Sequence, residues 1–283
     1  SNMKNLKLQD IKRWAKRLFS YMSIILSASC TLYGVWLFIR IFITDTFTIP
    51  SDSMLPTLHQ GNRIFVNKTL MGARIYTDFH FSKDGTELKS FRTKGFRSIK
   101  HNDIVAFNMP NKDWQIKFVI NYVFCKRCIA LPGDSISIIN GVYRNNNYPG
   151  KLGIYQQQLA LKNLPDSLIS PGALRAIPFE DHLPLWTIKN FGPLYIPRKG
   201  DILNINTQNA ALYKILLEYE IRQTIDINWN KNQVSINGKP FTRHVFLHNY
   251  YFMAGDNVLD SYDSRYWGLV PEDYIIGIVS CIL

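Results

Sequence analysis

The sequence has few cysteines and no cluster of metal ligands. Its 283 residues include only four cysteines and six histidines. Cys125 and Cys128 have the spacing Cys-x-x-Cys, but no second pair is present to complete a zinc site, and positions three apart in a strand face opposite sides. We therefore expect plain buried cysteines, no metal and no cofactor. Whether Cys128 and Cys281 pair stays open at this stage.

The usual serine-protease signatures are also missing. No histidine lies in a motif that sets up a catalytic triad, and there is no Gly-x-Ser-x-Gly turn. We expect surface or structural roles for the histidines. Asp256, Asp260 and Asp263 do not follow the spacing of a calcium-binding loop. The net charge is +12, but the basic residues form no recognition helix, zinc finger or aromatic RNA-binding motif, which argues against a nucleic-acid partner.

One apolar run is long enough to cross a membrane. No charge interrupts residues 18–39, and about 20 such residues at a rise of about 1.5 Å span the hydrocarbon core. We predict a transmembrane helix over residues 18–43. A cleaved signal peptide, ending at the small residues 27–29 before Cys30, is the alternative, but the run continues well past that point.

The residues before this run are basic and indicate its orientation. Residues 1–17 carry six basic side chains opposed only by Asp10, and residues 1–3 look like the remnant of an expression tag. By the positive-inside rule, this segment lies in the cytoplasm and everything after Arg40 lies outside. The basic residues are Lys4, Lys7, Lys12, Arg13, Lys16 and Arg17.

The rest of the chain is predicted to be mostly β. Short β-branched and aromatic segments alternate with turn residues, which is typical of antiparallel sheets. We expect a membrane-anchored antiparallel core from residues 44–134 and 246–283, and an inserted β-rich lobe at residues 135–245. Asn-Gly pairs at 140–141 and 237–238 predict hairpins. Residues 71–100 are expected to form an extended hairpin or loop, and residues 210–225 an amphipathic helix. The expected strands are 63–67, 103–108, 119–131, 135–139, 233–236, 250–253 and 275–283.

A serine-bearing turn follows the apolar run closely. Pro50 and Pro56 restrict the backbone on either side of Ser51 and Ser53, which favours a stiff, non-helical loop. An ordinary turn leaving a membrane helix is the simpler interpretation. A serine hydroxyl needs a neighbouring base to act as a nucleophile. If Ser53 is reactive, its chemistry takes place at a membrane surface.

Lysine is a candidate base if burial lowers its pKa. Lys126 is the best placed because it follows the apolar residues Tyr-Val-Phe-Cys at 122–125. Lys117, nine residues earlier, is a second candidate. The alternative for Lys126 is a charged residue at a strand edge with no chemical role.

Four blocks in this order resemble the bacterial type I signal peptidases, also called leader peptidases. They cover about a quarter of the chain, and most of the inserted lobe is unmatched. The blocks are Ile-Pro-Ser-Asp-Ser-Met-Leu-Pro-Thr-Leu (49–58), Asn-Asp-Ile-Val-Ala-Phe (102–107), Lys-Arg-Cys-Ile-Ala-Leu-Pro-Gly-Asp (126–134), and Gly-Asp-Asn (255–257) continuing to Ser-Tyr-Asp-Ser-Arg-Tyr-Trp-Gly (261–268).

The resemblance implies a role for each matching residue. Ser53 would be the nucleophile, and Lys126 the general base that takes its proton and returns it to the leaving amine. The Ser53 backbone N–H and the Ser51 hydroxyl would form an oxyanion hole. Ser261 would orient the lysine amine.

Two further residues would support the site, and one position departs from the family. Asp263 and Arg265 would hold their loop as an ion pair. Val258 stands where the family often has an arginine after Gly-Asp-Asn, so the ionic support of this loop is expected to differ.

By resemblance, the protein cleaves signal peptides from exported preproteins after small residues at positions −1 and −3. The expected location is the bacterial plasma membrane, with the bilayer surface and the secretion machinery as partners. Two alternatives remain at this stage. One is a self-cleaving Ser–Lys regulatory protease, and the other is a non-catalytic, membrane-anchored β domain that binds export substrates.

Overall fold

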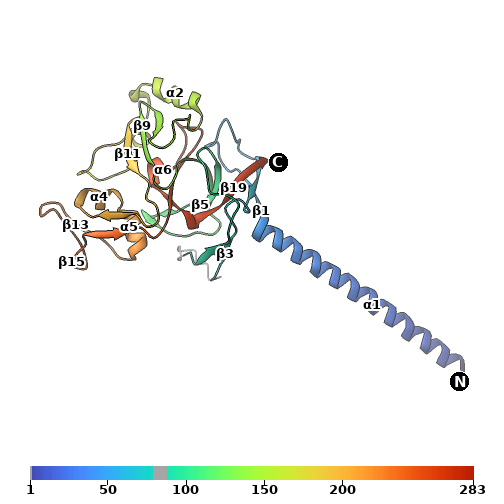
Figure 1. Ribbon diagram of the computed structural model, residues 1–283. Helices are drawn as coiled ribbons and strands as arrows, with labels where there is room; N and C mark the ends of the chain where they lie inside the picture. The colour runs from blue at the N-terminus through green and yellow to red at the C-terminus, as the bar shows by residue number, and fades with distance from the viewer. Residues whose placement is uncertain (1, 79–87) are drawn as a thin grey trace.

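A single long helix projects from a β-rich body (Figure 1). The computed structural model describes residues 2–78 and 88–283, with side chains from residue 11 onward. Helix α1, Asn2–Phe38, continues into one π-helical turn, Ile39–Ile43. Within the described residues, one helical stretch, Ile11–Ile43, is long and apolar enough to cross a membrane. The predicted span, residues 18–43, lies inside it.

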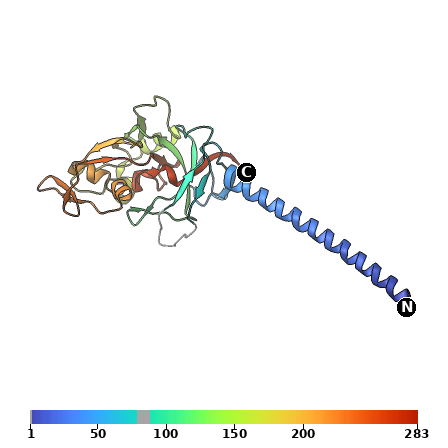
Figure 2. The same ribbon diagram turned by 60° about the horizontal axis from the view of Figure 1, so that its bottom comes forward.

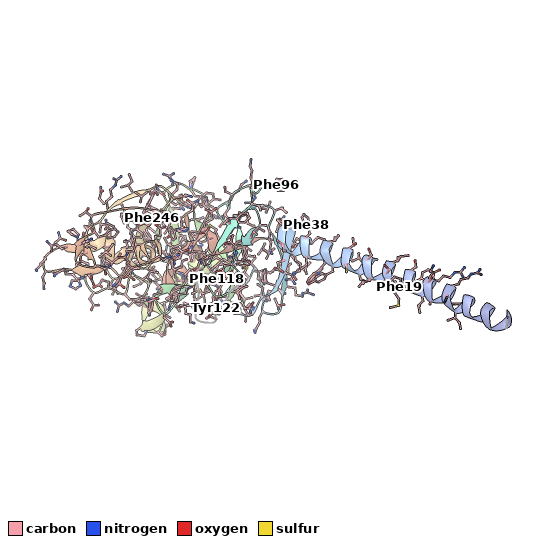
Figure 3. All side chains as sticks on the ribbon, turned by 90° about the horizontal axis from the view of Figure 1, so that it is seen from below. Phe19, Phe38, Phe96, Phe118, Tyr122 and Phe246 are labelled. Carbon is pink, nitrogen blue, oxygen red and sulfur yellow. The ribbon has the colours of Figure 1, made fainter. Side chains whose placement is uncertain are left out.

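The described apolar side chains of α1 are largely exposed, because the β body does not pack against them. Leu18, Phe19, Ile25 and Leu32 are all more than half exposed. In Figure 3 Phe19 points away from the helix, whereas Phe118 and Phe246 lie inside the body. Each Å² of apolar surface that is exposed to water costs about 25 cal/mol of free energy. A lipid environment removes that cost, which is consistent with a membrane anchor.

The body is built on a seven-stranded antiparallel sheet, as predicted. Its strand order is β1-β2-β19-β5-β8-β17-β18, and β1 starts directly after the π-helical turn. The bounds are β1 Thr44–Thr48, β2 Arg63–Asn67, β5 Ile104–Asn108, β8 Val123–Ala130, β17 Tyr250–Ala254, β18 Val270–Pro271 and β19 Ile275–Ile282.

Alternating side chains of the central strands face two apolar layers. Val105 and Phe107 of β5 join the large core, while Ala106 between them joins a smaller cluster on the other face. This alternation follows from the period of two in a strand. The smaller cluster includes Met54 and Leu58 of the serine-bearing turn, both 1% exposed. Burying each such side chain stabilises the turn by about 1.5–3 kcal/mol.

The segment between residues 135 and 245 shares one apolar core with the main sheet. Ile136 and Leu194 from this segment belong to the same apolar cluster as Val105 and Phe252. Its sheets are β10-β9-β11, β12-β16 and β13-β14-β15. The bounds are β9 Ser135–Ile139, β10 Val142–Asn145, β11 Phe191–Tyr195, β12 Ile202–Asn204, β13 Asp226–Asn228, β14 Gln233–Ile236, β15 Lys239–Pro240 and β16 Arg243–Val245.

The remaining elements are short helices and two small hairpins. Strands β3, Arg74–Tyr76, and β4, Ser90–Arg92, pair as the predicted hairpin, while its Asp84-Gly85 turn lies outside the described residues. The other elements are β6 Asn111–Lys112, β7 Gln115–Ile116, α2 Tyr155–Asn163, η2 Asp166–Leu168, α3 Pro171–Leu174, α4 Thr207–Leu212, α5 Lys214–Ile221, α6 Ser264–Trp267 and η3 Glu272–Tyr274.

Two sequence predictions need correction. The single helix expected over residues 210–225 is two helices, α4 and α5, separated at Tyr213. Helix α4 starts earlier because Asn206 and Asn209 form a capping box. Helix α5 ends at Ile221, and the next residue, Arg222, has a left-handed φ of 58°. The strand expected from residue 119 starts at Val123.

A buried asparagine explains the late start of that strand. The side-chain amide of Asn108 donates to the carbonyls of Val119 and Ile120, at 3.0 and 2.8 Å. These carbonyls are therefore engaged by a side chain rather than by a neighbouring strand. The predicted hairpins at 140–141 and 237–238 do form, with positive φ at both residues of each Asn-Gly pair, as type I′ turns require.

Candidate active site

The serine-bearing turn connects β1 to β2 and is held at both ends. Ile49 N–H donates to the carbonyl of Asn62, and Gly61 N–H donates to the carbonyl of Ile49, each at 2.8 Å. Between these bonds, the buried side chains described above attach the turn to the sheet. Ser53 is half-buried and Ser51 is exposed. The turn is therefore fixed in place while it presents two hydroxyls at the surface.

Lys126 lies on strand β8, and its side chain extends to the serine-bearing turn. A hydrogen bond joins its Nζ to the Oγ of Ser53. The lysine is 2% exposed. Burial lowers the pKa of Lys126 below its ordinary value, and the nearby carboxylate of Asp263 opposes this shift only in part. The structure thus pairs a serine hydroxyl with an amine that gives up its proton more readily than a lysine in water does.

Ser51 stands beside the same hydroxyl. Its Oγ donates to Ser53 Oγ at 3.3 Å. A donor in this position, together with the Ser53 backbone N–H, is suited to a negative charge that develops next to Ser53. The pairing of Ser51 with Ser53 agrees with the role that the resemblance implies, which remains a prediction.

Asp263 and Arg265 form a fully buried ion pair. Arg265 Nε donates to Asp263 Oδ1 and Nη2 donates to Oδ2, both at 2.8 Å. Burial by itself raises the pKa of Asp263, but the charge and hydrogen bonds of Arg265 outweigh it and hold the pKa below its usual value. Asp263 also accepts from the Gly255 N–H at 2.9 Å. The ion pair therefore connects residues 263–265 to Gly255, at the two ends of the loop that follows β17.

Ser261 lies close to the dyad, but no hydrogen bond to Lys126 forms. Its side chain is 7% exposed, and its Oγ has no hydrogen-bond partner among the described residues. A Cβ at Gly255 would overlap both Ser261 Oγ and the carbonyl oxygen of Ser53. Glycine at position 255 therefore leaves the space that Ser261 and the Ser53 carbonyl occupy. The orienting role of Ser261 stays a prediction.

The structure adds three residues that sequence reasoning missed as part of the site. Arg127 donates to both oxygens of Asp256, at 2.7 and 2.6 Å, and Thr57 Oγ1 donates to Asp256 Oδ2 at 2.5 Å. Asp256 is 1% exposed. Sequence position could have indicated two of these residues, because Arg127 directly follows Lys126 and Asp256 directly follows Gly255.

The loop after Asp256 completes the attachment of the serine turn. Asn257 N–H donates to the carbonyl of Ser53 at 3.1 Å, and its side-chain amide donates to the carbonyl of Asp52 at 3.2 Å. Val258 is 2% exposed and packs in the large core. This position therefore supplies packing to the loop and no ion pair.

A cavity of about 400 Å³ lies between the start of the serine-bearing turn and strand β8, and neither Ser53 nor Lys126 is among its wall residues. Cys125, next to Lys126, forms part of its wall. Burial raises the pKa of the Cys125 thiol to about 12, so the thiol stays protonated near neutral pH. All four cysteines are free, so Cys128 and Cys281 do not pair. The other wall residues are Phe47, Thr48, Ile49, Pro50, Ile64, Ala106, Ile120, Asn121, Val123 and Phe124.

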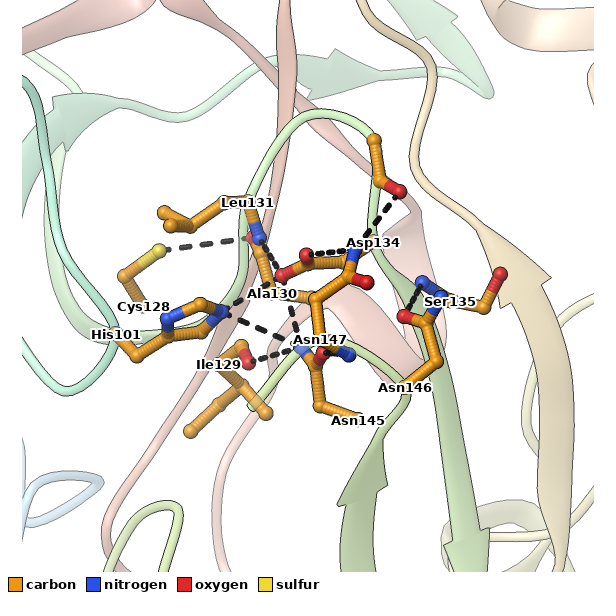
Figure 4. A network of polar contacts seen from close by, with 11 residues as sticks. His101, Cys128, Ile129, Ala130, Leu131, Asp134, Ser135, Asn145, Asn146 and Asn147 are labelled. Carbon is orange, nitrogen blue, oxygen red and sulfur yellow. Dashed lines mark hydrogen bonds and ion pairs between the residues drawn. The ribbon is translucent and has the colours of Figure 1, made fainter. Parts of the chain in front are cut away.

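Three of the described histidines, His101, His244 and His248, have structural contacts with buried carboxylates. His101 Nε2 lies 2.7 Å from Asp134 Oδ2, which also accepts from Asn145 Nδ2 and Leu131 N–H at 2.8 Å (Figure 4). This network fixes the turn that follows β8. His244 and His248 contact the buried Glu220, at 2.6 and 3.1 Å. Among the described residues, no group of three or more His, Cys, Asp or Glu side chains is placed to hold a metal ion.

A serine bonded to a buried lysine on an antiparallel β body defines a serine hydrolase in which lysine replaces histidine as the base. Comparison with known proteins agrees with this class. The family model described as "Signal peptidase, peptidase S26" matches residues 18–167 and 195–283. The chain therefore belongs to the signal peptidase family of serine proteases, which is membrane-associated.

Known relatives carry the same description. The chain is 30% identical over 241 residues to the signal peptidase I of Buchnera aphidicola subsp. Baizongia pistaciae, covering 84% of this chain and 69% of that protein. It is 25% identical over 252 residues to the signal peptidase I of Helicobacter pylori strain J99, covering 85% and 75%. A solved signal peptidase I from Enterococcus faecalis covers 65% of this chain and 98% of that chain at 17% identity, with a TM-score of 0.31.

Proposed function

We propose that this protein cleaves signal peptides from exported preproteins with Ser53 as nucleophile and Lys126 as general base. The observation that carries the proposal is the hydrogen bond between Lys126 Nζ and Ser53 Oγ in a site where burial favours the neutral amine. Family membership supports the reaction class. The assignment of each residue rests on the geometry of the site.

The proposed reaction has two stages. As Ser53 Oγ attacks the scissile carbonyl carbon, its proton passes to Lys126, and the C–N bond then breaks as Lys126 returns that proton to the leaving amine. The carbonyl oxygen carries the negative charge between the donors of Ser53 N–H and Ser51 Oγ. Lys126 then takes a proton from a water that attacks the acyl ester, and it returns that proton to Ser53 Oγ as the ester C–O bond breaks and the acid product leaves.

Ser261 and the Asp263–Arg265 pair have positioning roles in this proposal. Ser261 has a buried, unpaired hydroxyl, and in this proposal it would orient the amine of Lys126. Asp263 and Arg265 hold the backbone on which Ser261 lies. Neither member of the ion pair needs to touch the reacting atoms.

We infer that the substrate binds in an extended form, with small residues at positions −1 and −3. The cavity between Ile49 and Pro50 of the serine-bearing turn and strand β8 is lined mostly by apolar side chains. An extended peptide that adds to a sheet edge directs alternate side chains into neighbouring pockets. A shallow apolar pocket accepts an alanine side chain and excludes a charged one.

The location proposed for the active site is the outer surface of the bacterial plasma membrane. The basic segment before the anchor supports a cytoplasmic N-terminus. Arg40 at the end of the anchor bonds to Asp45 at 2.6 Å, and Lys68 bonds to the same carboxylate at 3.3 Å. These contacts tie the anchor to the β body and keep Ser53 near the bilayer. The bilayer surface and the secretion machinery would then be the partners.

The test uses purified full-length protein and a preprotein whose signal peptide ends in Ala-x-Ala. Wild type should cleave it, and Ser53→Ala and Lys126→Ala should each lose at least about 10³-fold in kcat/KM. Retained cleavage in either variant would refute the dyad. No cleavage by wild type would favour a non-catalytic binding domain, and cleavage of its own chain alone would favour a regulatory protease.

A further inference from the structure

A second cavity, of about 460 Å³, lies apart from the serine–lysine pair. Its size is within the range of about 300–1,000 Å³ that is typical of ligand sites. None of its wall residues lines the 400 Å³ cavity at the start of the serine-bearing turn, and neither Ser53 nor Lys126 is among them. The wall consists of Trp114, residues 177–180, Leu194, residues 211–216 and residues 267–269.

Large apolar side chains make up the rim and the walls of this second cavity. Trp114, at the tip of the β6–β7 hairpin, and Phe179 meet edge to face with ring centroids 5.2 Å apart. They are 56% and 44% exposed. Leu194 and Leu216 form buried parts of the wall. Two half-exposed aromatic rings beside a buried apolar wall are suited to receive another large apolar group.

One wall residue carries an unpaired polar atom. Trp267 lines the cavity and is 1% exposed, and its indole Nε1 has no hydrogen-bond acceptor among the described residues. A buried donor without an acceptor is uncommon and costs free energy. A ligand that carries a carbonyl next to an apolar group would supply both missing contacts. A peptide with a large apolar side chain has this chemistry.

The position of the cavity favours a polypeptide over a lipid. Helices α4 and α5, which form one wall, lie on the side of the body away from α1 in Figure 1, and the orange segments of Figure 2 show the same separation. A bilayer that surrounds α1 therefore does not reach this side. A polypeptide that extends from the proposed active site away from the membrane is the occupant that this placement favours.

We propose that this second cavity is an accessory binding site for the mature part of the preprotein, which it holds by an aromatic or branched aliphatic side chain downstream of the cleavage point. The inference rests on the proposed function, because it needs a polypeptide that is already engaged at Ser53. It adds a contact that a short signal-peptide substrate does not make.

The kinetic test compares a long preprotein with a short peptide that ends a few residues after the cut. The double variant Trp114→Ala/Phe179→Ala should raise KM for the long substrate about 10-fold and leave the short peptide unaffected. Replacing the aromatic residues of the mature part by alanine should abolish the difference. Leu168→Ala/Leu185→Ala, at exposed apolar residues outside the cavity, is the control and should change neither substrate.

The outcomes separate this inference from the proposed function. If wild type cleaves both substrates but the double variant has the same KM for the long one, the accessory site is wrong and the catalytic proposal stands. If wild type cleaves neither substrate, the catalytic proposal fails. An equal rise in KM for both substrates would mean that the variant disturbs the active site and would overturn the accessory site.

A binding measurement tests the site without turnover. In Ser53→Ala protein with ¹⁵N-labelled tryptophan, N-acetyl-phenylalanine amide should shift the indole signals of Trp114 and Trp267 in a saturable way, with a dissociation constant on the order of 1 mM. Trp229 should not shift, and Trp267→Phe assigns the buried signal. N-acetyl-alanine amide should have no effect. Absence of a shift, or equal shifts with both probes, would overturn the proposal.

Discussion

Lys126 shows how burial changes the acid–base behaviour of an ordinary residue. In water, a lysine amine is almost entirely protonated near neutral pH. Its place on β8 removes solvent, which lowers its pKa, while Asp263 limits the shift. The unfolded chain binds that proton more tightly than the folded one. Between the lowered pKa and the ordinary one, the free energy of unfolding therefore falls as the pH falls.

The lowered pKa predicts the pH dependence of cleavage. Because only neutral Lys126 can accept the proton of Ser53, kcat/KM should rise with pH through the lowered pKa and level off above it. Measurement of kcat/KM on a peptide substrate between about pH 5 and pH 10 checks this. A profile that stays flat over this range would contradict a lysine base.

Asp263 should matter to stability as well as to activity. Asp263→Asn leaves the buried Arg265 guanidinium without its counter-charge, and breaking a buried pair in this way typically costs about 3–5 kcal/mol. Chemical denaturation measures the loss. Asp201→Asn, at a pair in which the arginine side chain is 61% exposed, is the matched control and should change stability by less than about 1 kcal/mol.

At the scale of elements, the site depends on three segments that meet at Asp256. The serine turn contributes Thr57, strand β8 contributes Arg127, and the loop after β17 contributes Asp256 and Asn257. The lysine and the serine come from positions 73 residues apart. These contacts set the distance between them, and none involves the reacting atoms.

Thr57→Val tests this arrangement. The change keeps the shape of the side chain but removes its bond to Asp256, so stability should fall by about 1 kcal/mol and kcat should fall as the serine turn loosens. Denaturation and steady-state kinetics on the same preparation measure the two effects.

Thr207→Val supplies a control of the same kind. It removes a bond to Asn232 at a residue that is 4% exposed and lies in the 135–245 segment. It should reduce stability by a similar amount while kcat of the folded protein stays unchanged. If both variants lose kcat equally, the effect of Thr57 is one of general stability and the positioning role is wrong.

At the scale of the whole molecule, the anchor helix is joined directly to the sheet that carries the proposed active site. The helix ends in a π-helical turn, and β1 begins at the next residue. Ser53 therefore lies a short distance along the chain from the bilayer. A substrate whose apolar segment is itself in the membrane meets the enzyme by diffusion in two dimensions.

The proposed orientation predicts which cysteine reacts from outside the cell. Cys281 is exposed on the β body, Cys128 is buried and the thiol of Cys125 is held protonated. A membrane-impermeant maleimide added to intact spheroplasts should label the protein at Cys281, and Cys281→Ser should abolish that labelling. Labelling that appears only after lysis would place the β body in the cytoplasm.

Local patterns in the sequence were sufficient for much of the fold. The uninterrupted apolar run indicated the anchor, and strands 63–67, 135–139 and 233–236 match the structure because alternation and turn residues act within a few positions. The order of four short blocks also indicated the family. Asn-Gly pairs placed two hairpins correctly for the same local reason.

Contacts between distant residues were decided only in the folded chain. Asn108 moved the start of β8, and Tyr213 divided a helix that the periodicity had joined. The sequence by itself determined that Ser53 and Lys126 were the residues to examine. Only the tertiary structure decided that they meet, that burial lowers the pKa of Lys126, and that Thr57, Arg127 and Asp256 hold them together, because those facts depend on strand order and on the exclusion of water.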